Sequence, residues 1–262
     1  MSDRIIVTSN NGIGTITLNR PEQHNAIDYN MWRELGDAAR RLANDDKIKV
    51  VVLTGGGDKA FSAGADIKDF PEHRSSSPLA RDYAAAFEGA LDAIEAMPKP
   101  TISMIRGICV GGGCELATAT DLRIAATGST FGVPVAKIGV LVGYSEMRRL
   151  VRLVGPGNAM NLLLTARIVD EQEALRIGLI TEVVTPAKLD EYTYELATKM
   201  TDYAPLSQSG HKRILRTVLD NPGLQGLSEE EQAFPLTIFD AEDGMEGYWA
   251  FVEKRLPKFT GR

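Results

Sequence analysis

The sequence predicts an α/β protein, and two observations carry this prediction. Up to about residue 140, short apolar runs alternate with helical patterns, which is typical of mostly parallel sheets covered by helices. From Val140 onward the strand patterns almost disappear and helical patterns follow one another. We therefore expect an α/β core over residues 1–200 and a C-terminal helical region over residues 201–262.

Periodicity and capping residues define the elements of the core. Two strands flank a turn at residues 10–12, and a long helix follows Asp28, whose side chain can cap its first turn. A second long helix ends at Pro98. The remaining core elements are buried strands at 48–55 and 99–107, a short helix at 113–118 and two strand pieces within 121–132.

The C-terminal part of the chain is predicted to be almost entirely helical. The exception is a strand within residues 179–184, "LITEVV". The predicted helices are 145–155, 156–166, 170–178, 186–202, 205–220, 228–240 and 242–256.

Composition excludes several classes of function. A net charge of −6 and a pI near 5.3, without a basic cluster, argue against nucleic acid and anionic membranes as partners. The N-terminus lacks a secretory signal pattern, so we expect a cytoplasmic protein. Cys109 and Cys114 have no second pair, which predicts free thiols, and the scattered His24, His73 and His211 predict no metal site.

Two stretches rich in small residues point to chemistry. Gly111–Gly113 directly precede Glu115, so a helix beginning there would aim unpaired N–H groups at a ligand oxygen, with a carboxylate beside it. Residues 61–68, "FSAGADIK", offer a second backbone that a ligand can approach. The alternatives are a plain tight turn and a solvated first-turn glutamate. Neither stretch fits a phosphate-binding loop.

In this order and separation, the two stretches resemble the crotonase superfamily of enoyl-CoA hydratases and isomerases. The resemblance extends to "LNRPEQHNAID", "EALRIGLITEVV" and "GYWAFVEKRLPKFTGR", and so covers nearly the whole chain. It implies a crotonase-like spiral of ββα units with a C-terminal helical trimerisation region, assembled as a homotrimer or a dimer of trimers. It also implies a lyase of fatty acid metabolism that acts on an acyl-CoA and needs no cofactor besides the CoA of the substrate.

The resemblance also implies roles for individual residues. The N–H groups of Ala63 and Gly112 would hold the thioester oxygen, and Glu115 would be the first catalytic carboxylate. The loop from Arg20 to Ala26 would meet the nucleotide of CoA. The implied substrate-binding residues are Gln23, His24, Ala26, Ala65, Asp66, Ile67, Phe251 and Lys254, the last two sometimes from a neighbouring subunit.

One departure from the family pattern leaves the exact reaction open. Val135 stands where hydratases carry their second catalytic glutamate. Tyr144 and Glu146 lie near the implied acyl pocket and are candidates for the missing acid; the alternative is that they simply begin a helix. Hydration of an enoyl-CoA is the first hypothesis. Decarboxylation of a malonyl-type thioester, other enolate-forming chemistry and non-catalytic acyl-CoA binding are the alternatives.

Overall fold

Two sheets organise the protein, whose computed structural model describes residues 3–262. The six-stranded sheet has the order β1-β2-β3-β5-β7-β10, and only its β1–β2 pair is antiparallel. The four-stranded sheet has the order β4-β6-β8-β9, with β4, β6 and β8 parallel. The strands are β1 Ile5–Asn10, β2 Ile13–Leu18, β3 Val50–Gly55, β4 Ala60–Ser62, β5 Thr101–Ile105, β6 Ile108–Val110, β7 Leu122–Ala126, β8 Thr130–Gly132, β9 Val169–Asp170 and β10 Glu182–Val184.

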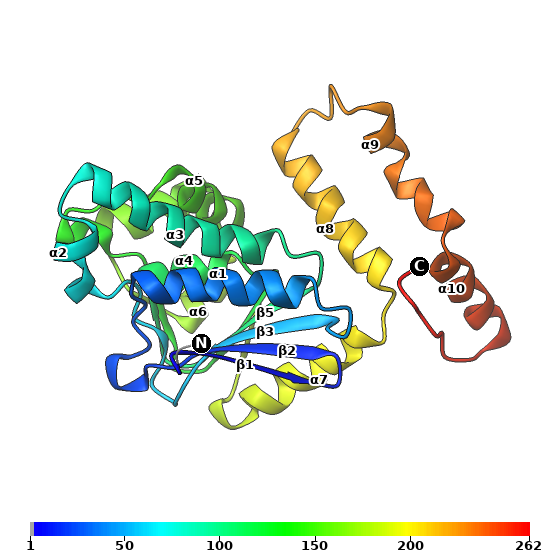
Figure 1. The fold of residues 1–262 in the computed structure, drawn as a ribbon, viewed down its shortest axis with the longest axis horizontal. Helices are drawn as coiled ribbons and strands as arrows, with labels where there is room; N and C mark the ends of the chain where they lie inside the picture. The colour runs from blue at the N-terminus through cyan, green and yellow to red at the C-terminus, as the bar shows by residue number, and fades with distance from the viewer. Residues whose placement is uncertain (1–2) are drawn as a thin grey trace.

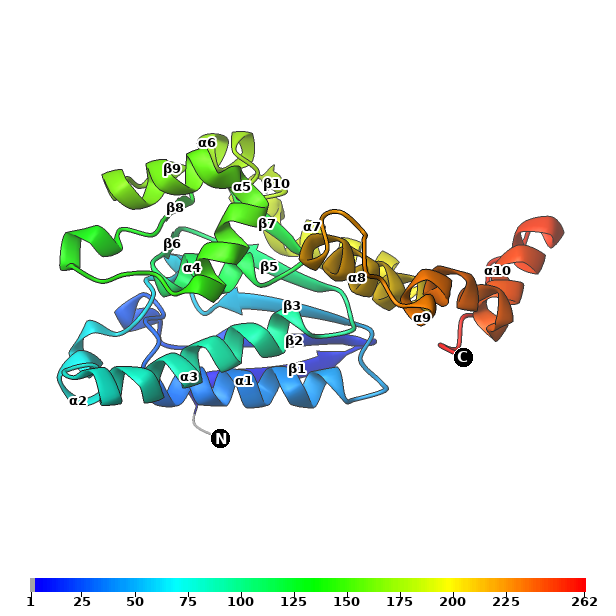
Figure 2. The same ribbon diagram turned by 90° about the horizontal axis from the view of Figure 1, so that it is seen from above.

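Helices cover both faces of the larger sheet. On one face α1 (Tyr29–Ala43) lies beside α3 (Ser77–Glu95), and α7 (Leu189–Thr201) packs on the opposite face (Figures 1 and 2). Strand β3 serves both sides, because Val51 and Leu53 join the core under α1 and α3 while Val50 and Val52 join the core under α7.

A ββα unit recurs three times and gives the fold its spiral. In each unit the first strand enters the six-stranded sheet, the second enters the four-stranded sheet, and a helix follows. The three units are β3–β4–α3, β5–β6–α4 and β7–β8–α5, where α4 is Gly112–Thr118 and α5 is Tyr144–Thr165. The predicted spiral of ββα units is therefore confirmed, although no internal repeat is visible in the sequence.

The last helices extend away from the sheets as an arm. Helix α8 (Pro205–Asp220) begins the arm, and α9 (Glu229–Ala233) and α10 (Glu242–Glu253) lie beyond it (Figures 1 and 2). Lys212 ties α8 to the core through an ion pair with Asp121 at 2.6 Å. The α7–α8 turn, at residues 202–204, lies next to the predicted boundary at residue 200.

Most predicted elements are present, with instructive differences. Asp28 caps α1 by accepting a hydrogen bond from the N–H of Met31 at 2.9 Å, as predicted. Helix α5 contains a break at Gly155, matching the two helices predicted on either side of it. The sequence did not predict the three-residue strands β4 and β6, the two-residue strand β9 or the short helix α2 (Phe70–His73). The predicted helix at 170–178 is α6 (Glu171–Arg176).

Candidate active site

The two small-residue turns lie side by side because β4 and β6 are paired. Ala60 pairs with Ile108 and Ser62 with Cys109 in a parallel register. The turns at 63–65 and 111–112 therefore leave the same edge of the smaller sheet.

The glycines of the triplet are needed for different reasons. Gly111 has a φ of +53°, a conformation that side chains disfavour. A Cβ on Gly113 would lie only 2.5 Å from the carbonyl oxygen of Ser62, so this glycine lets α4 pack closely on β4. Gly112 lines a cavity. A Cβ on Gly112 would also come within 3.2 Å of the Trp32 ring, so close packing explains Gly112 and Gly113 alike, and ligand access stays a prediction for Gly112.

The backbone N–H groups of Ala65 and Gly112 face the same space. Among residues 3–262, neither group donates a hydrogen bond. The nitrogen of Ala65 lies 3.4 Å from the point that a Cβ on Gly112 would occupy. Two unpaired donors thus converge at the N-terminus of α4.

The structure does not support Ala63 as one of these donors. Its N–H is already engaged, because it donates to the carbonyl oxygen of His24 at 2.8 Å. Ala65, expected among the substrate-binding residues, has the unpaired N–H two residues further on. The predicted assignment of Ala63 is therefore replaced by Ala65.

A cavity of about 610 Å³ opens beside this donor pair. Its walls are mostly apolar, and five charged side chains line it: Arg74, Glu88, Glu115, Lys137 and Glu146. Ala63, Ala65, Ile67, Gly112 and Val135 also line it. The cavity therefore brings together backbone donors, acids and an apolar surface, as small-molecule sites do.

Glu115 lies in the first turn of α4, and its carboxyl holds a proton unusually tightly. The pKa of Glu115 is raised to about 8, mainly by burial and secondly by the nearby Glu146 charge, while Arg74 acts in the opposite direction. A carboxyl that titrates near neutral pH can both give and take a proton at working pH. Glu115 lines the cavity, and its role as the acid or base stays a prediction.

Val135, which stands at the position of the missing second acid, and its two candidate replacements, Tyr144 and Glu146, have different positions relative to the cavity. Val135, at the start of a 3₁₀ turn (Val135–Ile138), contributes apolar wall. Tyr144 is 98% exposed and does not line the cavity. Glu146 is 3% exposed and does line it. Of the two predicted replacements, only Glu146 is therefore in a position to act.

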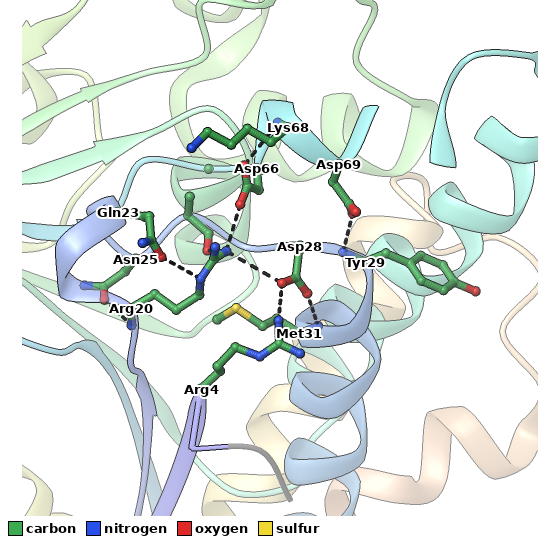
Figure 3. Close-up of polar contacts among 12 residues, drawn as sticks. Arg4, Arg20, Gln23, Asn25, Asp28, Tyr29, Met31, Asp66, Lys68 and Asp69 are labelled. Atoms are coloured by element: carbon green, nitrogen blue, oxygen red, sulfur yellow. Dashed lines mark hydrogen bonds and ion pairs between the residues drawn. The ribbon is translucent and has the colours of Figure 1, made fainter. Parts of the chain in front are cut away.

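The loop predicted to meet the nucleotide is held together by Arg20. Its guanidinium donates to Asp66 at 2.9 Å, to the carbonyl of Ala26 at 2.9 Å and to Gln23 at 3.0 Å, and it points between Asp66 and Asp28 (Figure 3). This network fastens the loop from Arg20 to Ala26 against the turn that carries Ala65. Gln23, His24, Ala26 and Asp66 do not line the cavity, and their predicted contacts with a nucleotide stay predictions.

Phe251 and Lys254 lie far from the cavity of their own chain. They belong to the end of α10, on the opposite side of the molecule from α2 and α3 (Figure 2). Phe251 is 86% exposed. A role for these residues in binding CoA therefore requires a neighbouring chain.

The histidines and cysteines correspond only partly to the expectations. Cys109 and Cys114 are buried free thiols, as predicted. His73, however, is not isolated: its ring stacks on Tyr29, and its ligand atom lies with those of Asp69 and Glu72 within 4.8 Å of one another. This small surface cluster lies on α2 and the residue before it, outside the cavity lining.

Sequence reasoning missed three charged residues of the cavity, Arg74, Glu88 and Lys137. Arg74 lies in a loop between α2 and α3, with its guanidinium 3.7 Å from the ring centroid of Tyr83. Glu88 lies on α3 among residues with ordinary helical spacing. Arg74 and Glu88 carry no local sequence signal, because tertiary packing brings a loop residue and a helix residue to the same cavity. Lys137 lies two residues after Val135, in the same 3₁₀ turn.

Comparisons with known proteins agree with this architecture. The enoyl-CoA hydratase/isomerase family model matches residues 8–262. The chain is 36% identical over 260 residues to a crotonyl-CoA hydratase of Syntrophomonas wolfei subsp. wolfei, covering 99% of both chains. It is 34% identical over 258 residues to a short-chain-enoyl-CoA hydratase of Clostridium acetobutylicum, covering 97% of this chain and 96% of the relative.

A solved structure shows the same likeness in three dimensions. The enoyl-CoA hydratase/carnithine racemase of Magnetospirillum magneticum superposes with a TM-score of 0.96 at 38% identity, covering 100% of this chain and 97% of that one. The fold and the site define a crotonase-type enzyme. The chain belongs to the enoyl-CoA hydratase/isomerase family. Within residues 3–262, no helix is long and apolar enough to cross a membrane.

Proposed function

We propose that this enzyme adds water to the double bond of a 2-enoyl-CoA and stabilises the thioester enolate formed on the way. One observation carries the proposal: two unpaired N–H groups, of Ala65 and Gly112, share a cavity with the raised-pKa carboxyl of Glu115. The names of the relatives, crotonyl-CoA hydratase and short-chain-enoyl-CoA hydratase, support the same reaction.

The donor pair supplies the electrostatic part of catalysis. As the nucleophile adds to the β-carbon, electron density moves onto the thioester oxygen, and two fixed N–H groups stabilise that charge. In comparable sites one such donor contributes about 3–4 kcal/mol to the transition state. The chemistry needs no cofactor beyond the CoA that the substrate carries.

Glu115 supplies a proton-transfer group beside the oxyanion. Hydration requires that one group take a proton from water while another gives a proton to the α-carbon. A carboxyl with a pKa of about 8 exists in both protonation states near neutral pH, so Glu115 is suited to either part.

Enolate formation by decarboxylation is the second candidate, and Val135 favours it. A valine at this point of the wall cannot move a proton, and an apolar wall discourages solvation of a carboxylate that leaves as carbon dioxide. The same donor pair would hold the resulting enolate. Glu115, which remains in place, argues against a purely binding role.

Incubation with a panel of CoA thioesters separates these reactions. Enoyl-, malonyl- and hydroxyacyl-CoA substrates are each incubated with the purified protein, and products are followed by mass spectrometry. A gain of one water on crotonyl-CoA supports hydration, and loss of carbon dioxide from malonyl-type thioesters supports the second candidate. No change in any thioester would overturn both.

We also propose that three or six chains assemble through the C-terminal arm. The arm exposes a series of large apolar side chains that a partner chain would cover. They are Leu215, Val218, Leu219, Leu236, Phe239, Met245, Tyr248, Trp249, Phe251 and Val252. Such an assembly is also the route by which Phe251 and Lys254 would reach a neighbouring site. A cytoplasmic location stays a prediction.

A further inference from the structure

Glu146 is a buried carboxylate without a partner. It is 3% exposed, and neither of its oxygens has a hydrogen-bond partner among the described residues. It occupies the third position of α5, where a glutamate usually bonds back to the N-cap backbone or faces water. Neither applies here, so the reading of Glu146 as an ordinary first-turn anion fails.

Gly143 makes room for this carboxylate. A Cβ on Gly143 would lie 2.3 Å from Oε2 of Glu146, so any other residue at this N-cap position would displace the carboxylate. The same point lies 3.4 Å from Oε1 of Glu88, so both carboxyl groups lie close to Gly143. The local backbone is thus fitted to the side chain of Glu146.

The arginines of α5 form their ion pairs with acids other than Glu146. Arg149, one turn later, donates through Nη2 to Glu95 at 2.7 Å and to Asp92, while its buried Nη1 has no hydrogen-bond partner among the described residues. The charge of Glu146 contributes to raising the pKa of Glu115 and, after burial, that of Glu88. Glu146 therefore acts electrostatically on the two other acids of the cavity, at the cost of burying an unpaired carboxylate.

We infer that Glu146 is the second proton-transfer group of this cavity and does the work that Val135 cannot do. The inference rests on the proposed hydration. A protein retains a buried, unpartnered acid against a stability cost mainly where function needs it. A cavity that holds Glu115 and Glu146 has the two carboxyl groups that hydration requires.

The two carboxyl groups complete a balanced reaction. One of them, ionised, takes a proton from water as the oxygen bonds to the β-carbon, and the π electrons move onto the thioester oxygen held by Ala65 and Gly112. The other, protonated, gives its proton to the α-carbon as the thioester carbonyl re-forms. The pair has then exchanged protonation states, and solvent restores them before the next turnover.

Glu146→Gln tests this inference, with Glu171→Gln as the matched control. Glu171 is also a buried first-turn glutamate, at the start of α6 and outside the cavity lining. We expect the kcat for crotonyl-CoA hydration to fall about 10²- to 10⁴-fold in Glu146→Gln and less than twofold in Glu171→Gln. In Glu146→Gln the Kd of butyryl-CoA should not rise. The urea midpoint of unfolding should not fall, since the loss of an unpaired buried carboxylate does not destabilise the fold.

A second variant keeps the acid but moves it. Gly143→Ala should displace the carboxylate of Glu146 and lower kcat at least tenfold. The inference is overturned if Glu146→Gln hydrates as fast as the control, or if its kcat falls only together with folding stability and butyryl-CoA binding. If the parent enzyme hydrates no enoyl-CoA, both the proposed function and this inference are overturned. If the kcat for hydration falls in Glu115→Gln but not in Glu146→Gln, only this inference is overturned.

Discussion

Replacement of Glu115 by glutamine should flatten the pH dependence of folding stability above pH 6. Burial first, and then the Glu146 charge, raises the pKa of the Glu115 carboxyl to about 8 from an ordinary 4.5. Because the folded chain binds this proton more tightly than the unfolded chain, the free energy of unfolding falls as the pH rises from 4.5 through 8. At about 1.4 kcal/mol per pH unit, the carboxyl lowers the stability of the parent by about 2–3 kcal/mol between pH 6 and pH 9.

Urea unfolding of the ligand-free protein measures this effect. The parent and Glu115→Gln are compared at pH 6, 7, 8 and 9, at one protein concentration because assembly also contributes to apparent stability. The parent should lose about 2–3 kcal/mol more than the variant across this range. Parallel curves for the two proteins would refute the reasoning, because they would mean that folding does not raise the pKa of Glu115.

Three further perturbations test other parts of the structure. Gly113→Ala should lower the free energy of unfolding by about 1–3 kcal/mol, because its Cβ meets the Ser62 carbonyl; an unchanged urea midpoint would contradict the close packing of α4 on β4. Val135→Glu should raise crotonyl-CoA hydration about tenfold or more in a Glu146→Gln background by restoring a second acid to the wall, and no gain in a folded double variant that binds thioesters would mean that Val135 does not face the reacting carbons. The parent should scatter light as three or six chains, and Trp249→Asp, at a 48% exposed position of the arm, should reduce that mass; a monomeric parent would contradict the proposed assembly.

Local patterns were sufficient to predict the elements that local chemistry determines. The side chain of Asp28 caps α1, Gly155 divides α5, and a helix begins within the triplet Gly111–Gly113. Each of these features depends on residues within one or two turns. The apolar run of β3 likewise identifies a strand that is buried on both faces.

Features that depend on contacts between residues far apart in the sequence could not be predicted from it. Strands β4 and β6 are three residues long, too short for a period, and exist because they pair with each other and with β8. The choice between Ala63 and Ala65 as a donor depends on the carbonyl of His24, which reaches Ala63 from a loop far earlier in the chain. A position in the sequence cannot reveal which of two neighbouring N–H groups is already engaged.

The burial of Glu146 is a further feature that could not be predicted from the sequence. Its place in the first turn of α5 is visible in the sequence and suggests a solvated anion. Its burial depends on Gly143, which allows the carboxylate to fold back, and on α3, which brings Glu88 alongside. Helical spacing alone predicts neither contact.

The most direct test of the central claim is the rate of crotonyl-CoA hydration by the parent and by Glu115→Gln. The claim is that Glu115 moves a proton while the backbone N–H groups of Ala65 and Gly112 hold the thioester. Butyryl-CoA should therefore bind both proteins with similar micromolar Kd, while hydration by Glu115→Gln should be about 10²- to 10⁴-fold slower. Equal rates in the two proteins, or no hydration by the parent, would contradict the account.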